Sequence, residues 1–514
     1  MIYKSNSKLL KTILILITCF ILTGCTNPYL SENEKSLPTL NIDTEESVDD
    51  NLHKAEGHIT LGLYNLDTLN PLMTNNESFR TYLSLVFDSL IVYDKDCIPR
   101  FCIADDINTN DGGLSWNIKL KENILFHDES PLTAYDVKNT IEWIQNNKCY
   151  YTEKLYNVEK IDIIKNNELI VVLKDYDSIF PSKLNFPIIK SEDLLGDYTK
   201  LNGTGMYKQI SGMTFSVFEN YYGTLPKIKS IEILNFDSSE ELFNSDADII
   251  MWQEDDSIKY SNKNNYSVGI YDDDIISCLI PSAKINNELK YYLCSILNKE
   301  LIVKAVYANK ASVKNIPLLD KTYFLNNYSS KSSYEISNIV LTNPIKFIVK
   351  ETDYDLLRIA EIIEKELPDT ILSETLICNE KEYNDLLKSG EYDFALQNIH
   401  LSPYPDFYDT FYSGGSKNLN KFSDNSIDNL ILSIKDAFKN QETSLVNDYN
   451  SFCEFSTTQV GKLSILLEEK LPVIPICQRK ASVFVSDRIS GISLYNFNFW
   501  NTFDSFNSVR LSDN

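Results

Sequence analysis

The apolar residues of this chain are too many for one hydrophobic core. The chain has 514 residues, 43% hydrophobic and 24% charged, which are ordinary proportions for a globular protein. Single cores stop growing near about 250–300 residues, so we expect two lobes. Strand patterns alternate with helix patterns along the sequence, for example a strand at 345–350 before a helix at 352–367, which favours mixed α/β lobes.

Hydrophobic periodicity gives the clearest secondary-structure signals. Period-two alternation predicts strands over 58–63, 114–120, 158–164, 168–174 and 345–350. Asn166-Asn167 joins the third and fourth of these strands as a hairpin signal. Apolar residues at helical spacing predict helices over 78–93, 288–307 and 352–367. Thr133 and Asp136 predict a capping box at the start of a further helix, which runs through Ile144.

The N-terminus has the pattern of an export signal. Three lysines precede an apolar stretch of about 11 residues, too short for a bilayer span that needs about 20. The stretch ends in Leu22-Thr23-Gly24-Cys25, which resembles the lipobox of bacterial lipoproteins. The resemblance implies that residues 1–24 are a signal peptide, and that Cys25 carries acyl chains such as palmitate that anchor the chain to the extracytoplasmic face of the cell membrane. An ordinary secretory signal with a chance cysteine is the alternative.

Residues 25–57 are polar and acidic, and the whole chain is strongly acidic, which argues against a nucleic-acid partner. Residues 25–57 begin with the cysteine and are rich in Ser, Asn, Glu and Asp, which predicts a flexible acidic tether. The net charge of −25 repels phosphate backbones, so we expect no nucleic-acid partner.

Eight cysteines follow Cys25 and show no Cys-x-x-Cys pair. They are Cys97, Cys102, Cys149, Cys278, Cys294, Cys378, Cys453 and Cys477. A chain this long does not need disulfide staples, so we expect buried free thiols. Cys97 and Cys102 are close enough in sequence to pair, and that alternative stays open.

Several short blocks, in order, resemble one family. The most specific is Phe126-His127-Asp128-Glu129-Ser130-Pro131-Leu132-Thr133-Ala134-Tyr135-Asp136-Val137, against a family pattern Phe-His-Asp-Gly-x-Pro-Leu-Thr-Ala-x-Asp-Val. The others are Leu66-Asp67-Thr68-Leu69-Asn70-Pro71-Leu72, 86–90, 111–112, 114–120, Asn202-Gly203-Thr204-Gly205-Met206-Tyr207, Tyr404-Pro405-Asp406-Phe407 and 471–475. By these motifs residues 58–514 resemble the family 5 extracellular solute-binding proteins, which include oligopeptide-, dipeptide- and nickel-binding lipoproteins of ABC importers.

The resemblance implies a fold and a set of partners. The fold is a two-lobed α/β, periplasmic-binding-protein-like fold of type II with an enlarged first lobe and two crossing strands. Lobe I would hold 58–270 plus 472–514, and lobe II 271–471, with a hinge near Trp252-Gln253 and Pro472. Closure would bury the solute between the lobes. The implied partners are a peptide or similar small solute and the permease and ATPase subunits of an ABC importer. We expect a monomer without a cofactor.

The expected ligand residues depart from the family at one position. In peptide-binding members an aspartate of the second lobe pairs with the peptide's amino group, and here that position falls at Leu401. Asp406 would supply the carboxylate only in a shifted register. A buried ammonium without a counter-charge costs several kcal/mol, which argues against capture of an ordinary peptide amino terminus.

The candidate ligand residues are mostly aromatic or polar. Tyrosine offers a flat apolar face and one hydroxyl, which suits an adaptable cleft. The candidates are Tyr64, Trp252, His400, Ser402, Tyr404, Asp406 and Tyr408. His400 is either a cleft residue, because nickel-chelate-binding members use histidine, or a strand-end histidine without a ligand role. With only four histidines in the chain a bare-ion site is hard to assemble, so a metal would have to arrive inside a chelator.

Other signals point to scaffold rather than chemistry. We expect His127 to be a hydrogen-bonded structural histidine, and Gly203 and Gly205 to permit a turn with positive φ. The acidic runs 254–256 and 272–274 lack the spacing of a calcium loop and read as solvated turns.

The sequence therefore predicts a membrane-anchored binding protein that captures a peptide or similar solute and delivers it to an ABC permease. A nickel-chelate-binding member and a peptide-sensing receptor without bulk transport are the alternatives. We expect no enzyme, because the chain has no Gly-x-Ser-x-Gly, His-Glu-x-x-His, phosphate-cradling loop or Rossmann fingerprint.

Overall fold

The computed structural model describes most of the chain after the expected tether. It covers residues 57–94, 99–252, 263–319, 341, 343–401, 406–418, 420–437, 439, 443–492 and 506–512, with backbone only over 443–455. These residues belong to one compact unit, Asp49–Asn514. The expected signal peptide 1–24, Cys25 and the expected tether up to residue 56 lie outside the described residues, as do Cys97, Gln253, the run 254–256, Ser402 and Tyr404.

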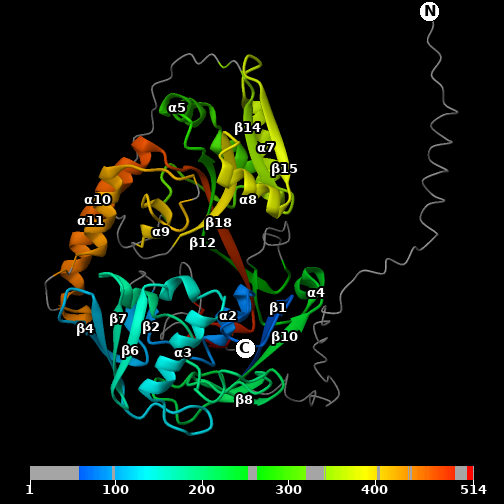
Figure 1. The fold of residues 1–514 in the computed structure, drawn as a ribbon. Coiled ribbons are helices and arrows are strands. Elements are labelled where there is room, and N and C mark those ends of the chain that lie inside the picture. Colours follow the sequence, from blue (N-terminus) through cyan, green and yellow to red (C-terminus); the bar gives the residue numbers. More distant parts are fainter. Residues whose placement is uncertain are drawn as a thin grey trace, which may run out of the picture. The chain divides into compact units, whose positions relative to one another are not determined.

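One mixed sheet of 11 strands organises the fold (Figure 1). Its order is β15-β14-β16-β12-β18-β11-β1-β10-β9-β8, with β13 paired to β18. The strands are β1 His58–Tyr64, β8 Tyr207–Ser211, β9 Thr214–Val217, β10 Ser230–Phe236, β11 Ile249–Trp252, β12 Tyr266–Pro281, β13 Ser312–Val313, β14 Ile345–Lys350, β15 Ser373–Cys378, β16 Phe394–His400 and β18 Ile474–Ser486.

Two long strands cross from one lobe to the other. β12 has 16 residues and β18 has 13, and they pair antiparallel. β18 pairs with β11 near its C-terminal end, whereas β12 pairs with β16 near its own. The crossing strands confirm the expected two-lobed α/β fold. Their register shifts between Asp272 and Ile276, and such a bulge bends a strand locally.

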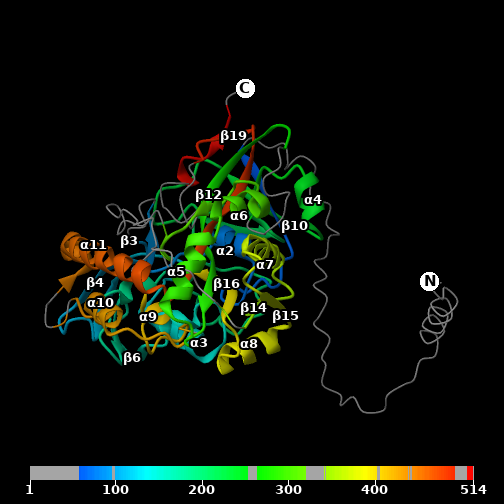
Figure 2. The same ribbon diagram turned by 90° about the horizontal axis from the view of Figure 1, so that it is seen from above.

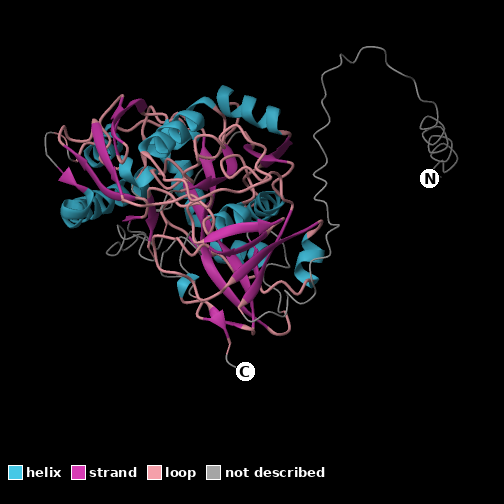
Figure 3. Ribbon diagram, turned by 90° about the horizontal axis from the view of Figure 1, so that it is seen from below, coloured by secondary structure: helices cyan, strands magenta, loops and turns pink. Residues whose placement is uncertain are grey.

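A second, antiparallel sheet has the order β17-β4-β5-β7-β6. Figure 3 shows the strands in magenta and the helices in cyan. Its strands are β4 Ala104–Thr109, β5 Ser115–Leu120, β6 Val158–Lys165, β7 Glu168–Leu173 and β17 Thr443–Ser444. The predicted strand at 114–120 and the hairpin turning at Asn166-Asn167 are confirmed. Trp116, Ile118 and Leu120 alternate inward from β5 into the largest core cluster. That core also contains Phe411, Ile431 and Leu463, from the segment that we predict to be lobe II; the lobe boundaries stay a prediction.

Helices cover the sheets. They are α2 Glu77–Leu83, α3 Ala134–Asn146, α4 Ser239–Asn244, α5 Asn287–Ile296, α6 Lys299–Tyr307, α7 Tyr354–Glu366, α8 Glu380–Ser389, α9 Tyr408–Phe411, α10 Asn425–Lys435 and α11 Leu445–Lys470, with 3-10 turns at Thr152–Leu155 and Phe180–Lys183. Short pairs join β2 Ile91–Tyr93 to β3 Pro99–Phe101, and β19 Ile489–Ser490 to β20 Arg510–Leu511. Figure 2 shows α10 and α11 side by side. Across the described ranges, no helix has the length and apolar character to cross a membrane.

Local capping decides where the helices begin and end. The capping box of Thr133 and Asp136 is present at the start of α3, as predicted. The helix expected over 288–307 is two helices, because Leu297 is extended and the Asn298 side chain accepts a hydrogen bond from Leu301 N to start α6.

The helix expected over 78–93 was predicted too long. α2 ends at Leu83, and a strand follows at Ile91–Tyr93. The carbonyls of Leu85 and Val86 accept hydrogen bonds from Tyr207 N and Gly205 N, at 3.0 and 2.9 Å. Because these carbonyls accept hydrogen bonds from another segment, they do not accept the hydrogen bonds that would continue the helix.

The same contact explains why glycine is needed at positions 203 and 205, and the reason differs from the one predicted. Neither Gly203 nor Gly205 has a positive φ. A Cβ on Gly203 would overlap the carbonyl oxygen of Val86, and one on Gly205 would lie 2.6 Å from that of Leu85. Glycine is needed here for close approach of two backbone segments, and not for a left-handed turn.

His127 stabilises the segment that contains Gly203 and Gly205 through hydrogen bonds, as predicted for a structural histidine. Its ring is buried, with Nε2 3.0 Å from Gly205 O and Nδ1 3.3 Å from Gly203 N. Burial lowers the pKa of His127 to about 4, so at neutral pH Nε2 donates and Nδ1 accepts.

Two further expectations can be compared with the structure. The acidic run 272–274 is not a solvated turn: it lies in the crossing strand β12, where Asp272 and Asp273 are buried. Of the expected buried free thiols, Cys102, Cys278, Cys378 and Cys477 are buried and form no disulfide, whereas Cys149 is only half-buried.

Candidate functional site

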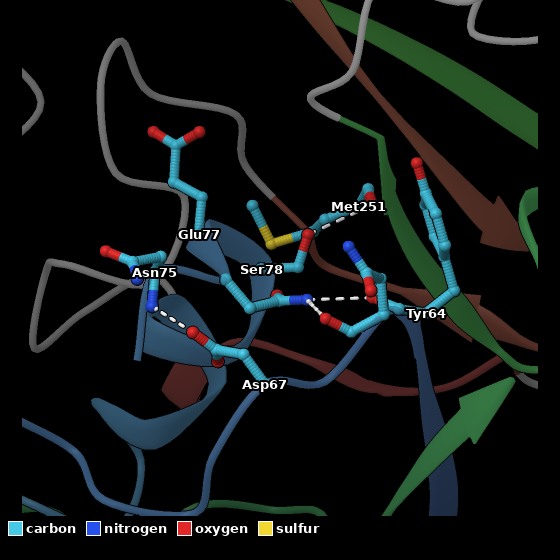
Figure 4. Close-up of a pocket in the computed structure, with 8 residues that line it drawn as sticks. Tyr64, Asp67, Asn75, Glu77, Ser78 and Met251 are labelled. Atoms are coloured by element: carbon cyan, nitrogen blue, oxygen red, sulfur yellow. Dashed lines mark hydrogen bonds between the residues drawn. The ribbon is translucent and has the colours of Figure 1, made fainter. Parts of the chain in front are cut away.

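A cavity of about 400 Å³ opens at the N-terminal turn of α2 (Figure 4). It lies beside the ends of two adjacent strands, since Tyr64 ends β1 and Met251 lies on β11. The lining residues are Tyr64, Asn65, Asp67, Asn75, Asn76, Glu77, Ser78 and Met251. All but Met251 come from the segment around the Leu66–Leu72 motif, so this motif shapes the rim of the cavity.

Short-range hydrogen bonds hold the rim in place. Asp67 accepts from Asn75 N at 2.7 Å and from Thr74 Oγ1 at 2.6 Å. Burial opposes ionisation of Asp67, but these bonds together lower its pKa, so it is a carboxylate at neutral pH. Asn76 caps α2 by accepting from Phe79 N, and its Nδ2 donates to Tyr64 O at 2.8 Å. Polar backbone and side-chain groups therefore face the cavity in fixed positions.

Glu77 connects the cavity to the crossing strands. It is half-buried in the first turn of α2 and interacts electrostatically with Asp274, Arg80 and His400. Burial and the neighbouring Asp274 carboxylate raise the pKa of Glu77. In Figure 4 its carboxylate points away from Asp67.

The bulge of β12 carries two consecutive carboxyl groups, Asp273 and Asp274, whose pKa values differ in the direction of their shift. Burial and Asp274 raise the pKa of Asp273 well above its ordinary value, although Arg479 lies 3.4 Å away. Burial opposes ionisation of Asp274, yet His400 at 3.4 Å lowers its pKa. The Asp274 pairing in turn raises the pKa of His400. The pKa values of these two neighbouring carboxyl groups therefore shift in opposite directions.

His400 and Leu401 lie next to this group. His400 ends β16, and its side chain is 61% exposed. Leu401 is buried, and its N–H donates to Asp274 O at 3.0 Å. The position without the family's aspartate therefore lies beside a carboxylate of the neighbouring strand.

Asp406 and Tyr408 lie at a second place. Asp406 pairs with Lys183 at 2.9 Å, and Lys183 pairs with the buried Asp177 at 3.0 Å. Tyr408 stacks on Tyr412, with ring centroids 4.4 Å apart. Asp406 and Tyr408 border a hollow of about 10 Å³, which is too small for a solute.

The two aromatic candidates of lobe I differ in exposure. Tyr64 lines the cavity, whereas Trp252 is 1% exposed and packs against Tyr64, Phe243 and Phe484. In this conformation Trp252 supports the wall behind Tyr64. Ligand contact by any of the seven candidates stays a prediction. Within the described part of the chain, no group of three or more His, Cys, Asp or Glu side chains is placed to hold a metal ion.

Comparison with known proteins identifies the family. A family model described as bacterial extracellular solute-binding proteins, family 5 middle region, matches residues 101–422, which is more than half of the chain. The chain belongs to this family.

Curated relatives match only part of this family 5 protein. The glutathione-binding protein GsiB of Pectobacterium atrosepticum is 26% identical over 179 residues, 32% of this chain and 35% of GsiB. The oligopeptide-binding protein AppA of Bacillus subtilis is 25% identical over 169 residues, 30% of this chain and 31% of AppA. The matched region thus spans about a third of each relative.

Solved structures match nearly the whole family 5 chain. AppA of Bacillus subtilis in complex with a nonapeptide superposes with a TM-score of 0.64 at 16% identity, over 89% of this chain and 99% of AppA. NikZ of Campylobacter jejuni in complex with Ni(L-His) gives 0.61 at 18% identity, over 88% of this chain and 99% of NikZ. At these identities the likeness shows the fold.

The charged residues near this cavity were not predicted from the sequence as one group. Glu77, Asp274 and Arg479 come from three separate elements, and no spacing in the sequence relates them. The acidic run at 272–274 directly precedes the nearly continuous apolar run 275–281, and this is the signal that could have placed it on a buried strand.

Proposed function

We propose that this protein captures a peptide at the cavity lined by Glu77, with Asp274 nearby, and delivers it to an ABC permease from the outer face of the cell membrane. Family membership supports solute binding, and the cavity at the start of α2 supplies space with fixed polar groups. AppA, which binds a nonapeptide in its solved structure, shares the fold over 89% of this chain.

The observation that carries the peptide proposal is the position of Asp274. Asp274 is hydrogen-bonded through its backbone to Leu401, where the resemblance places the amine-binding aspartate. Its lowered pKa keeps it charged at neutral pH. A carboxylate from β12 can thus hold the ammonium group that Leu401 cannot.

A nickel chelate is the second candidate. It is favoured by the exposed His400 imidazole beside Asp274, and NikZ with Ni(L-His) shares the fold. A sensing receptor would use the same cleft, and the identity of the genes beside this one would separate transport from sensing.

A thermal-shift screen of residues 26–514 tests the proposal. Ligand at 100 times its dissociation constant stabilises by about 2.7 kcal/mol, which moves the midpoint of a chain this size by about a degree or more. We expect a shift with pools of di- to nonapeptides, and a loss of that shift in Asp274→Asn with Asp105→Asn as a surface control. A shift only with nickel and histidine would transfer the assignment to the second candidate.

Membrane anchoring rests on the lipobox and has its own test. Cys25→Ala removes the acylated sulfur, so we expect the variant in the soluble fraction and the wild type with membranes. A Cys25→Ala variant that still sediments with membranes would overturn the anchor. A monomer eluting at the mass of one chain is expected in both cases.

A further inference from the structure

The larger of the two register shifts between the crossing strands lies at the acidic run of β12. The hydrogen-bond ladder reaches Asp272 of β12, opposite Lys480 of β18, and resumes on β12 at Ile276. On β18 it resumes at Gln478, so the three residues between Asp272 and Ile276 oppose only Arg479. Extra residues on one strand lie outside the ladder and bend that strand locally. The pairing of the crossing strands is therefore locally weakened at this bulge.

The bulge lies where β12 changes its neighbours in the sheet. Before the bulge, residues 266–272 pair with the part of β18 that also pairs with β11. After it, residues 275–281 pair with β16. A bend at this point therefore changes the angle between the part of the sheet that holds β11 and the part that holds β16. A few residues that take up such a change in backbone angle are what a hinge requires.

Charged groups from four elements meet at the bulge. Asp273 lies 3.4 Å from Arg479 of β18, and Asp274 lies 3.4 Å from His400 of β16. Both distances exceed the about 2.7–2.9 Å of a charge-assisted hydrogen bond. Glu77 of α2 interacts electrostatically with Asp274, His400 and Arg479. The other charged or titratable groups that act on these residues or adjoin them are Arg80, Tyr150, Lys154, Asp272 and Lys480.

Hydrogen bonds connect these side chains to the backbone of the bulge. Gln478 Nε2 donates to Asp273 O at 2.7 Å, and Leu401 N donates to Asp274 O at 3.0 Å. The Asp273 carboxyl group itself accepts from Asp274 N at 2.6 Å. A change in the charge of Asp273 therefore acts on a backbone hydrogen bond inside the bulge, between the contacts to β18 and to β16.

The protons of this group are held more tightly than usual. Burial and the neighbouring Asp274 raise the pKa of both Asp273 and Glu77, and Asp274 raises the pKa of His400. These three groups therefore lose their protons above the ordinary values of about 4 for a carboxyl group and about 6.5 for an imidazole. Each loss makes the bulge more negative.

The sign of the pH effect follows from these directions. A group with a raised pKa stabilises the folded arrangement fully below its ordinary value, and that stabilisation is lost as the pH rises through the raised value. Asp273, Glu77 and His400 all act in this sense. Asp274 has a lowered pKa, so its contribution is lost only below about pH 4 and stays constant at higher pH.

We propose that the bulge of β12 is a proton-operated hinge point. In mild acid, Glu77, Asp273 and His400 hold their protons, and the crossing strands stay paired on both sides of the bulge. As the pH rises, these groups lose their protons, the carboxylates of α2 and β12 repel one another, and the pairing beside the bulge opens more often. The pH of the surroundings then sets how freely the two parts of the sheet move.

Hydrogen–deuterium exchange of the purified protein, read by mass spectrometry, tests the hinge without any solute. Labelling at about pH 5, 6.5 and 8, with times scaled to the intrinsic exchange rate, reports local opening of the backbone. We expect protection over residues 270–281 and 474–481 to fall several-fold from the lowest to the highest pH. The β6–β7 hairpin of the second sheet is the reference, and the fall is measured relative to it.

Variants separate the bulge from other effects of pH. Glu77→Gln and Asp273→Asn each remove one titrating carboxyl group, so each should flatten the pH profile, and the double variant should flatten it most. Asp272→Asn is the matched control, because Asp272 belongs to the same acidic run but is still paired in the ladder. It should keep the profile of the wild type.

Two results would overturn the hinge. One is wild-type protection at the bulge that follows the reference hairpin at every pH. The other is a pH profile that persists unchanged in Glu77→Gln. Both readings remain available if Asp273→Asn does not fold, because the half-buried Glu77 and the wild type suffice for them.

The hinge and the proposed function fail separately. Peptides that raise the thermal midpoint of a protein with a flat exchange profile would leave peptide capture standing and remove the hinge. A pH-dependent profile in a protein that binds no peptide would keep the hinge and remove peptide capture.

Discussion

At the scale of single residues, the family motifs are explained by backbone contact. Gly203 brings its backbone against Val86, while His127 bonds to both Gly203 and Gly205. The sequence identified these residues as scaffold because they occur in motifs. It could not give the reason, because the partner segment at 85–86 lies more than a hundred residues away.

We expect Gly203→Ala to destabilise the protein by about 2–4 kcal/mol, because the added methyl group overlaps a carbonyl oxygen whose backbone must shift. Gly461→Ala is the matched control. Its Cβ meets nothing within 4 Å inside α11, so it should stabilise by up to about 1 kcal/mol. Denaturant unfolding measures both, and equal stability of the two variants would contradict the contact.

Asp88 makes stability depend on pH. Burial raises its pKa to about 7, although Tyr222, Cys102 and Thr204 hydrogen-bond to it. A carboxyl group with a raised folded pKa stabilises fully below about pH 4 and loses that contribution as the pH rises through 7. We therefore expect Asp88→Asn to gain stability relative to wild type across this window, by about 1–3 kcal/mol at pH 8.

Unfolding free energies of both proteins at pH 4, 6 and 8 check this prediction. Asp105→Asn, on the exposed face of β4, is the control for the same substitution at the surface. A constant difference for Asp88→Asn would show that Asp88 is ionised throughout.

At the scale of elements, periodicity predicted strands better than helix ends. The hairpin at Asn166-Asn167 and the capping box at Thr133 follow from local rules, and both are confirmed. The helix expected over 288–307 failed because an apolar face continues across Leu297, while the side chain of Asn298 starts a new helix there. The spacing of apolar residues shows which side of the chain is buried. A buried face can continue past the residue where the hydrogen bonds of a helix end.

The Asn298 cap can be measured directly. Asn298→Ala removes the acceptor for Leu301 N and should cost about 1 kcal/mol, while Asn298→Ser keeps a capping oxygen and should cost much less. Thermal or denaturant unfolding distinguishes them. Similar values for both variants would mean that the cap contributes nothing and that the two helices behave as one.

At the scale of the whole molecule, length alone predicted two lobes, and the crossing strands β12 and β18 bear this out. The charged contacts between distant segments could not be predicted from the sequence. Lys183 joins Asp177 of its own loop to Asp406, and Glu77 acts on Asp274 of the crossing strand. Such pairs depend on how segments far apart in the sequence are brought together, which no local pattern encodes.

Lys183 should therefore be among the costliest charges to remove. Lys183→Met leaves Asp177 and Asp406 as neighbouring carboxylates without a cation, and we expect a loss of about 3–5 kcal/mol. Lys119→Met, at an exposed pair with Asp105, should cost less than about 1 kcal/mol. Adding Asp177→Asn and Asp406→Asn to Lys183→Met should restore part of the loss; no restoration would mean that the aliphatic stem of Lys183 matters more than its charge.

In the function that we propose, one peptide occupies one site on each chain. Native mass spectrometry of residues 26–514, mixed with the di- to nonapeptide pool and then desalted, tests it most directly. We expect a single adduct per chain with the mass of a peptide, absent from the Asp274→Asn variant. A chain whose mass is unchanged by every peptide, or that gains mass only with nickel and histidine, would contradict it.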